Sequence, residues 1–143
     1  MHYLTIFLAL IPTLAVAAIP DSISEFSLKD FRGKTVSLSD FQDRQLVVVA
    51  FLGTECPLAK IYGRRLAELQ STYDETHPNS VAVLGIMSNR QDSITEIASY
   101  ARVHEIEFPL LKDLNHPVAD QLGADRTPQV FLLGAPAEDG SRA

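Results

Sequence analysis

The pattern of apolar positions along the chain switches between two periods, and each switch marks a change between strand and helix. Residues 45–52 (QLVVVAFL) and 81–86 (VAVLGI) are continuously apolar and rich in β-branched side chains, as in strands that are buried on both faces. A third apolar run at residues 129–133 (QVFLL) predicts another strand. Residues 26–38 alternate around a turn at Gly33 and predict a short β-hairpin at an edge of the sheet.

Between these strands the apolar residues recur at steps of three and four, which predicts helices. After Pro57 we expect a long helix whose apolar stripe packs on the core. That stripe contains Leu58, Ile61, Tyr62, Leu66, Leu69 and Tyr73. Ser93 and Glu96 form a capping box that opens a second helix. Its inward face carries Ile94, Ile97, Ala98 and Ala101. Residues 108–111 read as extended, and residues 117–122 predict a short third helix.

Strands that alternate with helices predict an α/β domain with partly parallel pairing, because parallel strands need long crossovers. The length of 143 residues suits one domain, and its 46% hydrophobic and 21% charged residues are an ordinary globular balance. Residues 134–143 (GAPAEDGSRA) are polar and turn-like, and they stand where a hairpin partner for residues 129–133 is expected. We therefore expect a domain that is short at its C-terminus.

The N-terminal segment has the composition of an export signal. Residues 3–19 carry no charged side chain, and residues 15–17 (AVA) provide a site for signal cleavage. Residues 1–17 are thus predicted to be a signal peptide, and residues 18–143 a domain that lies outside the cytoplasm, secreted or periplasmic. The alternative is an uncleaved membrane anchor, because the apolar segment approaches spanning length. Contact with a membrane is expected only in that case.

Charge excludes one class of partner. The formal net charge is −6 at pH 7, and acidic and basic residues are interleaved without a basic cluster. A nucleic-acid-binding surface would show as a positive stripe, so no nucleic acid is expected as a partner.

The only cysteine, Cys56, lies where a predicted central strand runs into a predicted helix, in the stretch GTECPLAK at residues 53–60. Pro57 suits a first helical turn, so the sulfur would face free backbone N–H groups and the positive end of the helix dipole. Lys60 adds to this field and Glu55 opposes it. Such a setting favours the nucleophilic thiolate. A buried structural cysteine is the alternative that position alone leaves open.

A metal site is a third alternative for the same sulfur. It would combine Cys56 with one of the histidines His77, His104 and His116. Soft-ligand sites normally use more than one sulfur, and this chain has one. We therefore predict no metal and no other cofactor.

Two motifs together resemble the thioredoxin-like superfamily. FLGTECPLA (residues 51–59) is similar to the FWATWCGPC stretch of thioredoxin-like proteins, and GADRTPQVFLL (residues 123–133) is similar to their G-x-x-x-TP-x-x-FLI segment. Between them, residues 108–124 are similar to the F-P-x-x-x-D…x-A-x-x-Y-G-V run of exported thiol–disulfide oxidoreductases and redoxins. The resemblance covers residues 25–134 in order and is to redoxins of the AhpC/TSA and TlpA type.

The resemblance implies a thioredoxin-like fold, with a central mixed sheet flanked by helices. It also implies a cis peptide bond at Thr127-Pro128, beside Cys56. In this interpretation Cys56 is the catalytic nucleophile, and Thr54, Pro57, Thr127 and Pro128 frame the substrate. The match favours a reactive Cys56 over a structural one.

Departures from these motifs bear on the mechanism. The second cysteine of C-x-x-C would fall at Ala59, and Ala50 stands where thioredoxins carry a buried acid. Val49 and Gly53 occupy the Pro and Thr positions of the peroxiredoxin pattern P-x-x-x-T-x-x-C. Without a neighbouring thiol, Cys56 would stop as a mixed disulfide or a sulfenic acid until an external thiol reduces it.

Two functions follow from this sequence. The first is an exported thiol-dependent oxidoreductase, an antioxidant redoxin that uses Cys56 on a disulfide or a peroxide, with a thiol protein or a small thiol as reductant. The second is a non-catalytic thioredoxin-like binding module that lost its dithiol chemistry with Ala59. Arg90 and Arg126, in predicted loops, could steer an anionic group, although a solvated loop is the simpler expectation.

Overall fold

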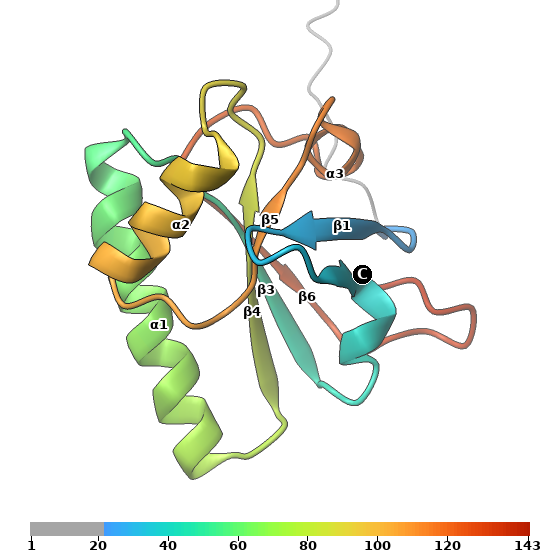
Figure 1. Ribbon diagram of the computed structural model, residues 1–143. Coiled ribbons are helices and arrows are strands. Elements are labelled where there is room, and N and C mark those ends of the chain that lie inside the picture. Colours follow the sequence, from blue (N-terminus) through green and yellow to red (C-terminus); the bar gives the residue numbers. More distant parts are fainter. Residues whose placement is uncertain (1–21) are drawn as a thin grey trace, which may run out of the picture.

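The described residues form ten secondary-structure elements, and nine of them follow the order that the sequence pattern predicts, the exception being a short 3-10 helix that was not predicted. The computed structural model describes residues 22–143, so the predicted signal segment lies outside the described residues. The elements are β1 (Ser27–Asp30), β2 (Thr35–Ser37), a 3-10 helix η1 (Leu38–Phe41), β3 (Leu46–Phe51), α1 (Pro57–Thr76), β4 (Val81–Met87), α2 (Ile94–Val103), β5 (Leu110–Lys112), α3 (Pro117–Leu122) and β6 (Gln129–Leu133) (Figure 1). Each predicted strand and helix is present.

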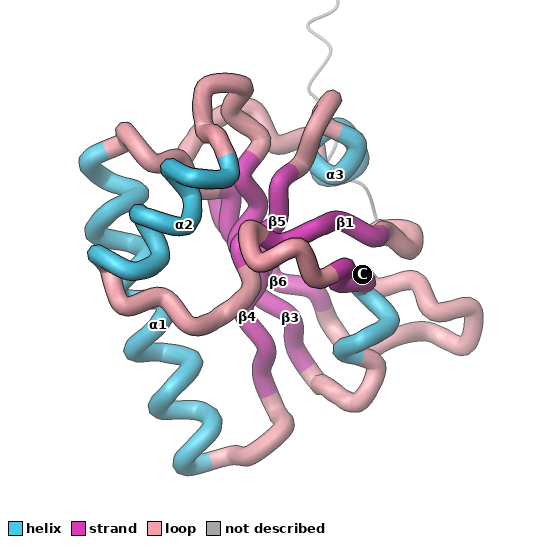
Figure 2. Tube along the Cα trace, viewed as in Figure 1, coloured by secondary structure: helices cyan, strands magenta, loops and turns pink. Residues whose placement is uncertain are grey.

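The strands form one mixed sheet in the order β2-β1-β5-β4-β3-β6. β3, β4 and β5 run parallel, whereas β6, β1 and β2 pair antiparallel with their neighbours. The sheet stands between two layers of helices and loops (Figure 2). Because β3 and β4 are parallel, the loops that follow them meet at one edge of the sheet. The loop after β3 contains Cys56, so this edge carries the candidate site.

Two apolar clusters lie on opposite faces of the sheet. Val47 and Val49 of β3 belong to the cluster beneath α3 and the β1–β2 hairpin. Val48 and Ala50 belong to the cluster beneath α1 and α2, the two helices seen together on one side in Figure 1. Burial on both faces explains why this strand reads as a continuous apolar run rather than an alternating one.

The face of α1 that packs on the core differs from the predicted one. α1 buries the small residues Ala59 and Gly63 together with Leu66. Five of the six residues in the predicted stripe are exposed: Leu58, Ile61, Tyr62, Leu69 and Tyr73. Close approach is the reason, because a Cβ atom on Gly63 would lie 2.5 Å from the Tyr100 hydroxyl oxygen. In α2, likewise, Tyr100 is buried and Ile94, predicted to face inward, is exposed.

β6 forms one edge of the sheet, and within residues 22–143 no further strand or helix follows it. Val130 and Leu132 are 46% and 61% exposed. They stand opposite Ala50 and Val48, so they lie on the same face of the sheet as α1. Two apolar side chains of this edge strand are therefore exposed on that face.

Residues after β6 turn back and are held by a buried arginine. Arg142 is 1% exposed, and its backbone pairs with that of Ile23. Its guanidinium donates to the carbonyl oxygens of Phe41, Arg44 and Gly134. The last residues are thereby fastened to the segment between η1 and β3. None of the helices in residues 22–143 has both the length and the apolar content that crossing a bilayer would need.

Candidate active site

Cys56 is the residue that caps the N-terminus of α1, with Pro57 at the first helical position. A turn precedes it, in which the Cys56 N–H donates to the Gly53 carbonyl at 3.3 Å. The side chain is half-buried and rests against the cluster beneath α1 and α2. Cys56 is thus partly buried, and it lies at the N-terminus of α1, the positive end of the helix, where the sequence predicts it.

The second motif lies directly beside this sulfur. Thr127-Pro128 is a cis peptide bond, as the resemblance predicts. The Cys56 thiol donates a hydrogen bond to the Thr127 carbonyl oxygen at an Sγ–O distance of 3.5 Å. The pairing of β3 with β6 matches Phe51 with Gln129, which brings the two loops together. Of the predicted site residues, Cys56, Pro57, Thr127 and Pro128 therefore meet at one place.

Thr54 has a partner that the sequence did not indicate. Its hydroxyl donates to the Oδ1 atom of Asp92 at 2.5 Å, and its backbone N–H donates to the same oxygen at 3.3 Å. Asp92 is fully buried, and its Oδ2 atom accepts a hydrogen bond from Asn89 at 3.1 Å. The only available signal was an acidic residue next to the helix cap Ser93, and this reads equally well as part of the cap.

Two titratable side chains beneath the site have shifted pKa values. Burial raises the pKa of Tyr100, and the negative charges of Cys56 and Asp92 add to this effect. The neutral phenol donates to the Ala59 carbonyl at 2.6 Å, within the first turn of α1. Burial lowers the pKa of His104, with Lys60 and Arg64 adding to the shift. Tyr100 therefore serves as a fixed donor under the helix that begins at Cys56.

A cavity of about 490 Å³ opens beside Thr127. Its walls come from the end of β3, the loop after β4, α3 and the loop before β6, and they include Asn89, Arg90 and Arg126. Arg126 is paired with Asp125 at 2.6 Å, whereas Arg90 is exposed. This cavity is the space next to the candidate site in which a small substrate could lie.

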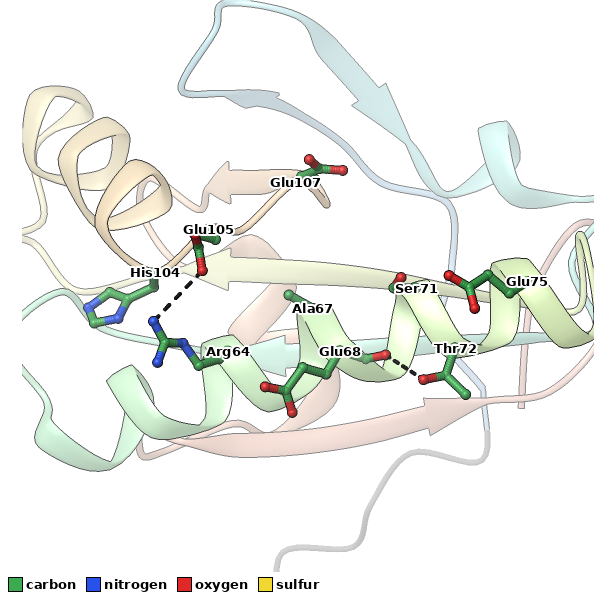
Figure 3. Close-up of a pocket in the computed structure, with 9 residues that line it drawn as sticks. All are labelled: Arg64, Ala67, Glu68, Ser71, Thr72, Glu75, His104, Glu105 and Glu107. Atoms are coloured by element: carbon green, nitrogen blue, oxygen red, sulfur yellow. Dashed lines mark hydrogen bonds and ion pairs between the residues drawn. The ribbon is translucent and has the colours of Figure 1, made fainter.

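A larger cavity of about 710 Å³ runs along α1, away from Cys56. Figure 3 shows its walls, which carry Glu68 and Glu75 on α1 and Glu107 beyond α2. An ion pair of 3.8 Å between Arg64 and Glu105 crosses one end. Its lining contains no cysteine and lies away from Cys56, so the cavity near Thr127 is the better candidate for thiol chemistry despite its smaller volume.

The histidines considered as metal ligands lie apart in the fold. His77 and His104 end α1 and α2, and His116 begins α3. Over residues 22–143, His, Cys, Asp and Glu side chains form no group of three or more that could hold a metal ion. The site residues are therefore a thiol, backbone carbonyl and N–H groups, and a buried carboxylate network.

A family model for AhpC/TSA proteins matches residues 19–137. The chain belongs to the AhpC/TSA family. Among its relatives, this redoxin is 29% identical to peroxiredoxin Bcp of Escherichia coli over 103 residues, which cover 72% of this chain and 62% of that protein. It is 26% identical to the thiol-disulfide oxidoreductase ResA of Bacillus subtilis over 125 residues, covering 83% of this chain and 66% of ResA. The redoxin chain thus spans less than two thirds of Bcp.

Solved structures share the same architecture. A hypothetical protein of Sinorhizobium meliloti superimposes with a TM-score of 0.75 at 26% identity, covering 89% of the redoxin and 68% of that chain. A secreted disulfide oxidoreductase of Mycobacterium tuberculosis gives a TM-score of 0.64 at 15% identity, covering 82% and 80% of the two chains. The second likeness concerns the fold alone. The thioredoxin-like fold predicted from the two motifs is confirmed.

Proposed function

We propose that this redoxin is a monothiol oxidoreductase that uses Cys56 to attack a disulfide or a peroxide. The observation that carries the proposal is the position of the partly buried Cys56 at the N-terminus of α1, with its sulfur 3.5 Å from the Thr127 carbonyl oxygen. Two relatives are named as a peroxiredoxin and a thiol-disulfide oxidoreductase, which supports both substrate classes. The apolar segment at residues 3–19 supports the further proposal that the protein acts outside the cytoplasm.

Attack on a peroxide oxidises the Cys56 sulfur by two electrons, whereas attack on a disulfide exchanges one S–S bond for another. With a disulfide, the Cys56 thiolate bonds to one substrate sulfur, the substrate S–S bond breaks, and the other sulfur leaves as a thiolate that takes up a proton. With a hydroperoxide, the thiolate bonds to the terminal oxygen, the O–O bond breaks, and the second oxygen leaves as an alcohol or water. The products on the protein are a mixed disulfide and a sulfenic acid. The Thr127 carbonyl accepts a hydrogen bond only from the protonated thiol, so that bond is lost when the thiolate attacks.

The sequence has one cysteine, so reduction must come from outside the chain. An external thiol first forms a disulfide with Cys56 or replaces the bound substrate thiol, and a second thiol then releases Cys56 in its reduced form. A thiol protein or a small thiol can do both. The first turn of α1 stays accessible for this exchange because Pro57 and Leu58 are exposed.

A non-catalytic binding module is the second candidate, and one observation favours it. Ala59 occupies the position of the second cysteine and is fully buried, so the packing there has closed around a methyl group. A chain that kept the fold only to bind thiol-bearing partners would tolerate this change.

Alkylation of Cys56 separates the two candidates. We expect iodoacetamide to label Cys56 at neutral pH faster in the folded protein than in the urea-unfolded chain, because a helix N-terminus stabilises the attacking thiolate. Mass spectrometry of quenched samples measures both rates. Labelling that is slower in the folded protein across the pH range where it stays folded would support the binding module instead.

A further inference from the structure

We infer that Asp92 is a positioning residue for Cys56, because it holds Thr54 and thereby the loop that presents the sulfur. The inference rests on the proposed function of Cys56 and adds a residue that does not touch the reacting atoms. Its starting point is a carboxylate with no exposed surface at the site edge of the sheet.

The contacts of Asp92 are all with neutral donors. Its Oδ1 atom accepts from the Thr54 hydroxyl at 2.5 Å and the Thr54 N–H at 3.3 Å, and its Oδ2 atom accepts from Asn89 at 3.1 Å. Within residues 22–143 no Lys, Arg or His nitrogen lies within ion-pair distance of it. Burying a carboxylate without a cation costs stability, and such groups concentrate where function requires them.

The position of Thr54 gives this network its consequence. Thr54 is two residues before Cys56, and both of its donors are fixed by one oxygen atom. Within the turn, the Cys56 N–H donates to the Gly53 carbonyl at 3.3 Å, and the Cys56 thiol donates to the Thr127 carbonyl at 3.5 Å. Asp92 therefore fixes the position of the backbone at Thr54, just before α1 begins. It thereby also fixes the position of the Cys56 sulfur relative to Thr127.

Asn89 extends the network to the loop before β6. A Cβ atom on Gly53 would lie 2.3 Å from the Asn89 Nδ2 atom and 3.4 Å from the Thr127 hydroxyl oxygen, so these three residues are in close contact. The Asn89 carbonyl oxygen in turn accepts from Lys112 Nζ at 2.5 Å and from the Asp92 N–H at 3.2 Å. Hydrogen bonds thus join the loops after β3 and β4, and Thr127 of the loop before β6 packs closely beside them.

Charge and position predict opposite effects when the carboxylate is replaced. A nearby negative charge disfavours a thiolate, so Asp92→Asn would speed the reaction of Cys56 if charge were its only influence. If Asp92 acts through position, the same variant slows the reaction, because an amide NH₂ group meets the Asn89 donor and loosens the loop. The sign of the change therefore tells the two roles apart.

The experiment measures the rate of mixed-disulfide formation between the full chain and Ellman's reagent, an aromatic disulfide. We compare the wild type with Asp92→Asn, Thr54→Val, Thr54→Ser and the Asp92→Asn/Thr54→Val double variant, under conditions in which urea titration shows each to be folded. Asp92→Asn and Thr54→Val should each slow the reaction by roughly 10-fold, because a misplacement of about 1 Å can cost about 100-fold and the loop keeps its other contacts. Thr54→Ser keeps the hydroxyl donor and should recover most of the rate that Thr54→Val loses.

The double variant should be no slower than the slower single variant, because both substitutions disturb the one hydrogen-bond network through which Asp92 holds Thr54. A wild-type protein that does not react while folded would refute the proposed function and this inference with it. A reactive wild type with an equal or faster Asp92→Asn variant would overturn the inference alone. If Asp92→Asn does not fold, the comparison of Thr54→Val with Thr54→Ser tests the inference instead. Equal reaction rates for these two variants would overturn the inference.

Discussion

The sulfur of Cys56 lies 3.5 Å from the carbonyl oxygen of Thr127, although the two residues are 71 positions apart in the chain. The register of β3 against β6 produces this proximity, since it aligns the last residue of one strand with the first residue of the other. A substrate that reaches the sulfur must also meet the backbone at Thr127. The two motifs of the sequence therefore belong to one site, and the predictions below depend on that arrangement.

A second thiol at the third helical position should give the redoxin internal turnover. Ala59→Cys places a sulfur one turn after Cys56, so a mixed disulfide on Cys56 should be released by an internal disulfide. The released substrate thiol is measured under single-turnover conditions. Ala59 is fully buried, so the larger side chain should also cost about 1–3 kcal/mol of stability through overpacking.

Ala59→Ser is the matched control because it adds a side chain of similar size without a thiol. Its adduct on Cys56 should persist as in the wild type. Release from both variants at the same rate would mean that a disturbed helix N-terminus, and not a resolving thiol, frees the substrate.

Arg142 should contribute measurably to stability. It is buried and donates to the carbonyl oxygens of Phe41 at 2.6 Å and Arg44 at 3.2 Å. Arg142→Ala leaves these acceptors without a donor, which should lower the free energy of unfolding by about 1–3 kcal/mol in urea titration. Arg126→Ala, which removes an exposed ion pair with Asp125, should have no measurable effect. Equal stability of the two variants would contradict this role.

His104 should make the folded protein less stable at acidic pH. Its pKa is lowered by burial, with Lys60 and Arg64 adding, so the folded state disfavours the protonated ring. The stability that the neutral ring contributes is present above the unfolded pKa of about 6.5 and is lost as the pH falls through the lower folded value. The wild type should therefore lose stability relative to His104→Gln between about pH 7.5 and pH 5, measured by urea titration.

Lys60→Gln tests the cause of that shift. It removes one of the two cations that disfavour the protonated ring, so the pH-dependent loss should shrink in this variant. A stability difference between wild type and His104→Gln that is the same at both pH values would show that protonation of His104 has no role.

The exposed apolar edge of β6 should drive self-association. Leu132 is 61% exposed on an edge strand without a charged side chain, which is an open template for pairing with another chain. Leu132→Lys should lower light scattering several-fold at a given protein concentration while the circular dichroism spectrum stays native. Leu133→Lys, at a buried position, should instead unfold the domain. Unchanged scattering in Leu132→Lys would place the association elsewhere.

Most of the fold could be predicted because its strands and helices carry strong local signals. The continuous apolar run of β3, the Pro57 start of α1 and the Ser93 capping box each act within a few residues. The buried face of α1 could not be predicted in this way. Large apolar side chains such as Leu58 and Tyr62 were predicted to be buried. The close approach of α2 instead requires small residues on the face of α1 that packs against it. That approach is a tertiary distance, and periodicity carries no information about it.

The residues of the candidate site likewise fall into those that local motifs indicate and those that only the tertiary structure reveals. The proximity of Cys56 to Thr127 and Pro128 could be predicted because the two superfamily motifs carry these positions. Asp92 could not be predicted, because its role depends on the parallel register of β3 and β4, which brings the loops after both strands to one edge. An isolated acidic residue beside a helix cap has the same local pattern whether it caps a helix or holds a neighbouring loop.

The central claim is that Cys56 attacks from the folded state and has no internal partner to release it. Intact mass spectrometry of the folded redoxin, after incubation with a small disulfide and removal of excess reagent, tests this most directly. We predict one stable adduct per wild-type chain, released by an added thiol, and none on Cys56→Ser. A folded wild type that stays unmodified by disulfide and by peroxide, while the urea-unfolded chain reacts, would contradict the account.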